Sequence, residues 1–157
     1  MFSIGDNIVY PMYGAGIVTD IVERDFLGES RKYYCVSLPY CKMEASVPVD
    51  NADALGVRGI IAKTEISAVV EVLGGETEEM SPNWNKRYRD NTEKLQTGDI
   101  KIVASVVRNL VRTDRVKPLS TGEKKLLNTA KQILISELIY VGGYTMDEAD
   151  DLVESHI

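Results

Sequence analysis

The sequence is poor in the side chains that most often carry catalysis or bind metals. Its only cysteines are Cys35 and Cys41, and its only histidine is His156, one residue from the C-terminus. Four zinc ligands cannot be assembled from this set, which favours two reduced thiols in or near strands. No nucleophile has an imidazole base nearby, and no carboxylate stands out as a general acid or base. We therefore expect a protein that is not an enzyme and needs no metal or cofactor.

Long hydrophobic runs are also missing. The longest apolar-rich stretch, residues 133–141, is interrupted by Ser136 and Glu137 and is too short to cross a bilayer. The first residues have neither the basic segment nor the apolar core of a signal peptide. No coiled-coil seam is evident either. These absences predict a soluble, cytoplasmic protein with no membrane partner, most simply a monomer.

An overall surplus of basic charge is absent, since the formal net charge is −6. The charge is unevenly distributed, however. Residues 1–81 hold 6 basic and 13 acidic side chains, and residues 126–157 hold 1 and 6, whereas residues 82–125 hold 11 and 5. Binding of a polyanion follows the local field rather than the total, so this basic island is a candidate phosphate-facing surface. The alternative is an ordinary solvated helical face.

The first third of the chain has the pattern of a small β domain. Short segments rich in β-branched residues predict strands at 7–10, 16–22, 32–38 and 45–49. Turn-forming residues separate them at 11–15 and 25–29. Strands of this length and spacing predict a strongly bent antiparallel barrel, which is marginal alone and expected to pack against the rest of the chain. Pro48 belongs at a strand end or on an edge.

From about residue 52 the pattern becomes helical. The first predicted helix runs from a cap at Thr64 to Leu73. The caps predicted for the next four helices are Ser81, with Pro82 in the first turn, Asp99, Ser120 and Thr145. Ser120 and Thr145 each precede a glutamate by three residues, which is the pattern of a capping box. The predicted fold class is therefore α+β, with a barrel over residues 1–52 and an all-helical domain over residues 53–157.

Trp84, the only tryptophan, lies at the mouth of the second predicted helix. It stands among the cations Lys86, Arg87 and Arg89. Trp84 also shares a helical face with Leu95, so it could simply begin a buried apolar stripe. Alternatively, a ring in the first turn protrudes and inserts at a minor-groove base step, while the cations and the free N–H groups of the helix hold phosphates. Periodicity leaves both interpretations open.

Three motifs together resemble a known family. They are Ile4-Gly5-Asp6-Asn7-Ile8-Val9-Tyr10-Pro11, Asn83-Trp84-x-x-Arg87-Tyr88 and Ser120-x-Gly122-Glu123-Lys124. They are similar to motifs of the CarD family of bacterial transcription regulators, including its CdnL-type members. The resemblance covers essentially the whole chain. Its opening motif is also similar to the polymerase-interacting module of transcription-repair coupling factors.

The resemblance implies a Tudor-like barrel that docks on the β subunit of RNA polymerase and a helical domain that contacts promoter DNA. In the family, the tryptophan that matches Trp84 acts in the minor groove at the upstream edge of the melted bubble. Cations that match Lys86, Arg87 and Arg89 support it on the DNA backbone. The implied function is stabilisation of the promoter open complex, with little dependence on DNA sequence.

The resemblance also suggests where polymerase is bound. The positions it implies are Arg24, Asp25, Phe26, Ser46 and Val47. Acidic Asp25 follows Arg24, and Ser46 stands where some relatives carry arginine, so we expect charge not to dominate the docking. A contact through the backbone, in which an edge strand joins the partner's sheet, would tolerate both changes. The competing hypothesis is a protein-interaction adaptor on polymerase, with Trp84 buried and no direct DNA contact.

Overall fold

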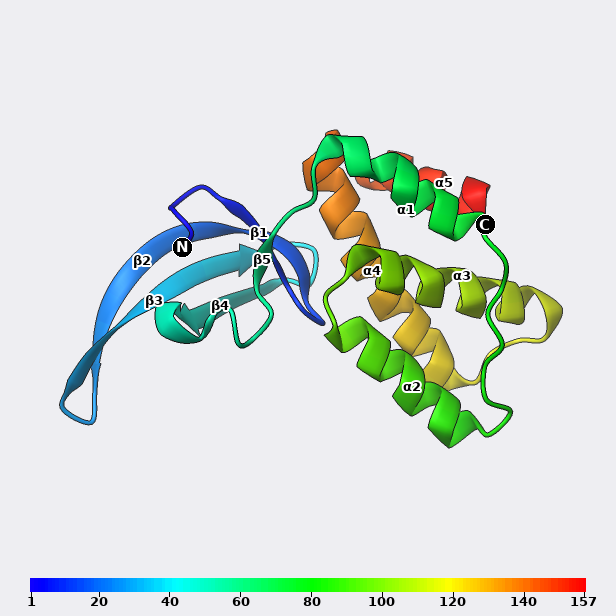
Figure 1. Cartoon of the computed structure of the whole chain (residues 1–157), viewed down its shortest axis with the longest axis horizontal. Helices are drawn as coiled ribbons and strands as arrows, with labels where there is room; N and C mark the ends of the chain where they lie inside the picture. The colour runs from blue at the N-terminus through cyan, green and yellow to red at the C-terminus, as the bar shows by residue number, and fades with distance from the viewer.

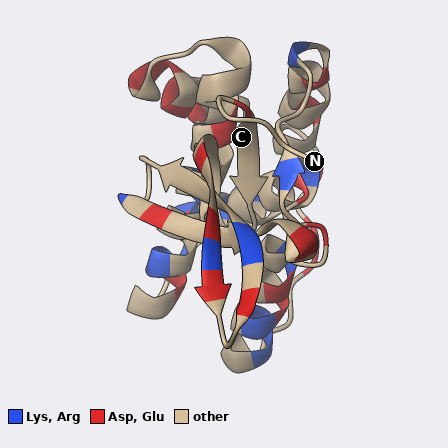
Figure 2. Ribbon diagram, turned by 90° about the vertical axis from the view of Figure 1, so that its left-hand side faces the viewer, with Lys and Arg blue, Asp and Glu red and all other residues tan.

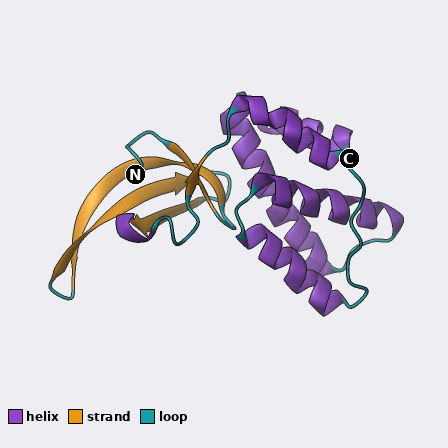
Figure 3. Cartoon of the chain, in the orientation of Figure 1, coloured by secondary structure: helices purple, strands orange, loops and turns teal.

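The computed structural model describes residues 1–157 and shows a β domain and a helical domain side by side (Figure 1, Figure 3). The strands come first in the chain and all five helices follow them. The predicted α+β class, with a small antiparallel β domain ahead of the helices, is confirmed.

The β domain is one antiparallel sheet of five strands. These are β1 (Asn7–Tyr10), β2 (Gly14–Phe26), β3 (Glu29–Leu38), β4 (Met43–Pro48) and β5 (Arg58–Gly59). Their order is β4-β3-β2-β1-β5, so the sheet curves but stays open, with β4 and β5 at its edges. Because β5 pairs with β1, the division predicted between residues 1–52 and 53–157 falls inside the sheet. A two-residue strand is too short to show periodicity in sequence.

The hairpin of β2 and β3 is longer than the sequence indicates. The two strands stay paired as far as Phe26 and Glu29, so the predicted turn at 25–29 contracts to Leu27 and Gly28. All residues from 23 to 32 are exposed, and we call this segment the arm. In Figure 1 the arm projects away from the helical domain. With neither face buried, the arm lacks the alternation by which strands are recognised in sequence.

The helical domain contains α1 (Ile66–Leu73), α2 (Trp84–Gln96), α3 (Ile100–Val116), α4 (Thr121–Gly142) and α5 (Met146–His156). A cluster of 20 buried hydrophobic residues holds these helices together, whereas the β domain has a cluster of eight. None of the helices combines the length and the apolar character that crossing a membrane requires.

Three predicted helix caps are confirmed, at Asp99, Ser120 and Thr145. Thr64 is not a cap: it lies in a short 3₁₀ turn, Lys63–Glu65, and Glu65 precedes α1. Ser81 is not the cap of α2, because the side chain of Asn83 accepts the bond from Lys86 N at 3.2 Å. Where several polar residues precede a helix, sequence alone does not show which one caps it.

The two domains are joined by polar contacts to α4. Ala15 N donates to Ser136 Oγ at 2.9 Å, and a Cβ on Gly14 would stand only 2.6 Å from the same oxygen. The Arg58 guanidinium makes a bidentate pair with Glu137, at 2.7 and 2.8 Å. Glu137 also accepts from Ile61 N at 2.9 Å. The last strand of the sheet is therefore attached directly to the longest helix.

Candidate nucleic-acid interface

Trp84 is the first residue of α2, and 56% of it is exposed. Tyr88, one turn later, is also exposed, whereas Asn91 and Leu95 on the same face are buried. The face therefore passes from solvent to core along the helix. The interpretation in which Trp84 begins the buried stripe is wrong, and so is the buried Trp84 of the adaptor hypothesis. The start of α2 extends past the helical core, which leaves the indole in solvent.

Arg87 turns inward from the same helical turn. Its Nε and one terminal nitrogen donate to the two oxygens of Glu123, both at 2.8 Å, and the other nitrogen donates to Ser81 O at 3.0 Å. The Arg87 side chain is 19% exposed and that of Glu123 is 4% exposed. The hydrogen bonds from Arg87 hold the pKa of Glu123 below its usual value, although burial opposes this. This pair ties the first turns of α2 and α4 together.

The capping box predicted at α4 is incomplete. Ser120 Oγ accepts from Glu123 N at 3.3 Å, as the sequence predicts. The Glu123 carboxylate does not return to the Ser120 backbone; its oxygens accept from Arg87 and, at 3.4 Å, from the Ser120 hydroxyl. Only half of the predicted box is therefore formed. The complete box occurs at α5, where Thr145 and Glu148 bond reciprocally.

Lys86 and Arg89 differ from Arg87 in being exposed. Lys86 Nζ pairs with Asp90 at 3.0 Å, one turn along the helix. Such a surface pair contributes little and is easily exchanged for another anion. Arg89 forms no ion pair or side-chain hydrogen bond. Of the three cations predicted to bind DNA, the structure therefore leaves two exposed in the first half of α2, on faces other than that of Trp84, and uses the third within the protein.

A groove of about 760 Å³ runs beside Trp84. Pro82 and Trp84 line one side, and Lys117, Pro118 and Ser120 come from the connection between α3 and α4. Lys117 is exposed and unpaired, and the start of α4 lies at the same groove. The N-terminal ends of two helices and a lysine therefore line the groove beside the indole, which favours negative charge there, while the two glutamates of the same groove, Glu78 and Glu123, are paired with arginines. Sequence reasoning missed Lys117; its only signal was membership of the basic island.

Other cations of the basic island are used inside the helical domain. Arg108, which is 5% exposed, donates to Val72 O at 2.8 Å and pairs with Glu78 at 2.9 Å. Arg112 donates to the carbonyl oxygens of Leu73 and Gly75. These arginines cap the C-terminal end of α1 and hold the connector that leads to α2. The island is therefore partly structural, and its formal charge overstates the charge offered at the surface.

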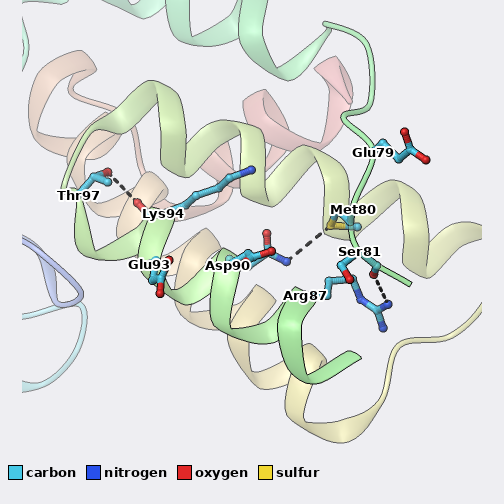
Figure 4. A pocket seen from close by; sticks show the side chains of 9 residues that line it. Glu79, Met80, Ser81, Arg87, Asp90, Glu93, Lys94 and Thr97 are labelled. Carbon is cyan, nitrogen blue, oxygen red and sulfur yellow. Dashed lines mark hydrogen bonds between the residues drawn. The ribbon is translucent and has the colours of Figure 1, made fainter. Parts of the chain in front are cut away.

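Both ends of α2 are fixed by contacts from distant parts of the chain. Near its start, Arg87 binds Glu123 of α4. Arg87 also donates to Ser81 O, just ahead of the helix (Figure 4), and Asn91 Nδ2 in the second half of α2 lies 3.6 Å from Met80 Sδ. Beyond its last turn, Gly98 O accepts from Arg58 at 2.9 and 2.7 Å. Arg58 belongs to β5, so the β domain itself holds the helix that carries Trp84. The position of the indole is thus coupled to the position of the sheet.

The five residues predicted to contact polymerase lie in two segments of the β domain. Arg24, Asp25 and Phe26 are on the arm, where Phe26 is 62% exposed, whereas Ser46 and Val47 are on edge strand β4. On β3, Arg24 pairs with Arg31 and Val47 pairs with Tyr34. Arg31 and Tyr34 are three residues apart along that strand, so the two segments lie about 10 Å from each other in the strand direction. Val47 is fully buried, backbone included, so it offers no surface of its own, whereas Ser46 beside it is exposed.

The arm also offers an open strand edge. Strand β4 pairs with β3 only from Tyr33 to Leu38, which leaves Glu29–Lys32 without a paired strand on that side, although Pro48, Asp50 and Asn51 line a groove with them. Arg24 and Arg31 face each other across the arm, and the Arg24 guanidinium lies 5.7 Å from the centre of the Tyr33 ring. Figure 2 shows Lys and Arg alternating with Asp and Glu along the arm, so no single sign of charge dominates it.

The two cysteines are free thiols, and burial raises the pKa of the Cys41 thiol. No group of three or more His, Cys, Asp or Glu side chains is placed to hold a metal ion.

Comparison with known proteins covers both domains. Residues 2–61 match the family described as the CarD-like/TRCF RID domain, and residues 68–154 match that described as the CarD C-terminal domain. A Bacillus subtilis (strain 168) protein named "Putative transcription factor YdeB" is 40% identical over 149 residues, which cover 92% of this chain and 95% of that protein. The chain therefore belongs to the CarD-like family of transcription factors.

Proposed function

We propose that this protein binds the β subunit of RNA polymerase through its β domain and stabilises the promoter open complex through Trp84. The observation that carries the proposal is a solvent-exposed indole at the start of a helix held at both ends. Family membership supports a role in transcription. That the partner is the β subunit, and that Trp84 enters the minor groove, are proposals that go beyond family membership.

The proposed DNA contact combines a wedge with a few cations. Trp84 inserts at the distorted junction of duplex and bubble, where unstacking a base step costs less than in closed duplex. Lys86, Arg89 and Lys117 contact phosphates around it, while Arg87 positions the helix through Glu123. With about three phosphate contacts, affinity for DNA falls about fortyfold between 50 and 200 mM salt. Free DNA is therefore bound weakly.

Binding to polymerase compensates for the weak affinity of the helical domain for DNA. A β domain docked on polymerase raises the effective concentration of the helical domain beside the promoter. Edge strand β4 suits a backbone contact near exposed Ser46 that extends a sheet of the partner, and Val47 anchors the strand from the buried side. Trp84 then shifts the promoter equilibrium by its difference in affinity between open and closed DNA.

The test is open-complex lifetime with purified polymerase, in the presence of the wild type or Trp84→Ala. We expect the variant to lose most of the stabilisation while binding polymerase with unchanged affinity. Val116→Ala is the matched control, because Val116 is an exposed apolar residue of the same domain. An unchanged lifetime with folded Trp84→Ala would reject the wedge. If charge reversal at Lys86 and Arg89 were also without effect, an adaptor without DNA contact would be the better description.

A further inference from the structure

The tip of the arm has a turn whose sequence does not suit its geometry. Phe26 pairs with Glu29, which leaves a two-residue loop of Leu27 and Gly28 with φ of 51° and 81°. A loop with positive φ at both positions is a type I′ turn, which favours Asn-Gly. Leucine is disfavoured in the left-handed region, because its Cβ approaches the following carbonyl oxygen. Leu27 therefore occupies a position that asparagine would fill with less strain.

No contact within the protein compensates for this choice. Leu27 is 90% exposed and Phe26 is 62% exposed, and neither belongs to a core cluster. The whole arm is exposed, so it adds nothing to the cores of the two domains. Figure 1 shows its tip at the lower left, away from the helical domain. An unfavourable backbone conformation that packs nothing internally suggests selection for an external contact.

We propose that Leu27, together with Phe26, inserts into an apolar pocket on the polymerase subunit that the β domain binds. This inference rests on the proposed function above and adds a contact to it. The partner at the tip is taken to be polymerase because the tip is continuous with the proposed docking edge. The unpaired backbone of Glu29–Lys32 leads from the end of β4 to the tip. A partner strand that extends along this edge places its own surface against Leu27.

The experiment compares Leu27→Asn with the wild type in two measurements, thermal unfolding and affinity for purified polymerase. The substitution installs the favoured Asn-Gly turn, so we expect the unfolding midpoint to rise by about 2–4 °C. The apolar contact is lost, so affinity for polymerase falls about tenfold or more. Leu27→Met keeps an apolar side chain and retains binding. These opposite effects separate a binding role from a structural one.

Lys42→Asn is the matched control, because Lys42 is an exposed residue of the same domain, in the turn between β3 and β4, with φ of 54°. It gains stability in the same way and binds polymerase as the wild type does. Wild-type affinity in Leu27→Asn overturns the proposal but leaves the proposed function standing. A wild-type protein that does not bind polymerase overturns both. Self-association of the wild type that Leu27→Asn abolishes makes a second copy the occupant and also overturns the proposal.

Discussion

Two exposed aromatic segments of this protein, the arm and the start of α2, are presented in opposite ways. Trp84 stands on a helix that Glu123 and Arg58 hold through arginine contacts at both ends. Phe26 stands on an arm with no contact to either core. A side chain that inserts between stacked bases must be held in position, which favours a rigidly fixed helix. A segment that gains its contacts from a partner needs no internal support.

The same comparison applies to the arginines of the two domains. Arg24 lies exposed on the arm, while Arg87 is enclosed by a carboxylate and a carbonyl oxygen. A motif that contains arginine therefore does not show whether the charge is available to a ligand. A guanidinium is available to a ligand only if the fold does not place a carboxylate within hydrogen-bonding distance of it.

The largest effect is expected where the two regions are joined. Glu137→Ala leaves the Arg58 guanidinium without its carboxylate partner and removes the acceptor of Ile61 N. Breaking a largely buried pair in this way costs about 3 kcal/mol. Chemical denaturation should show this loss, and open-complex stabilisation should fall with polymerase binding retained. Asn128→Ala, at an exposed position on the same helix, is the control and should change neither.

A smaller loss of stability is expected from weakening only the Arg87–Glu123 pair that holds the start of α2. Glu123→Gln keeps the shape of the side chain but removes the charge that Arg87 binds, at a cost of about 2 kcal/mol. Open-complex lifetime should shorten, and quenching of Trp84 fluorescence should change. Glu93→Gln, on the exposed side of α2, is the control. If the lifetime were unchanged despite the loss of stability, Arg87 would not be positioning the indole.

This pair should also have a pH signature. The pKa of Glu123 is lowered in the folded protein by the hydrogen bonds from Arg87. Its stabilising contribution is therefore complete above the unfolded pKa, about 4.3, and is lost as pH falls through the lower folded pKa. The difference in stability between wild type and Glu123→Gln should shrink as pH is lowered from about 5 to 3. A difference that grows in acid would contradict the assignment.

The smallest change in stability is expected from replacing Lys86, a cation that makes no contact with the core of the protein. Lys86→Gln removes only a surface pair with Asp90, so stability should change by less than about 0.5 kcal/mol. The salt dependence of DNA binding should weaken by about one phosphate contact, as measured by titration of DNA at several salt concentrations. An unchanged slope would place Lys86 away from the backbone.

Much of the fold can be predicted from local patterns. The strands near Ile8 and Val36 and the caps at Asp99 and Thr145 could be predicted, because strand periodicity and capping act within a few residues. Trp84 could be singled out, but its exposure could not, since periodicity also fitted a buried stripe. The partners of Arg58 and Arg87 lie 79 and 36 residues away, beyond the reach of any local pattern.

By itself, then, the sequence determined the order of the first four strands and the helices, the basic island and the family to which the chain belongs. Only the tertiary structure decided which cations of that island remain free and which serve as internal ties. The reason is physical: a guanidinium binds whichever carboxylate the packed helices bring within hydrogen-bonding distance, and that depends on how α2 lies against α4 and the sheet.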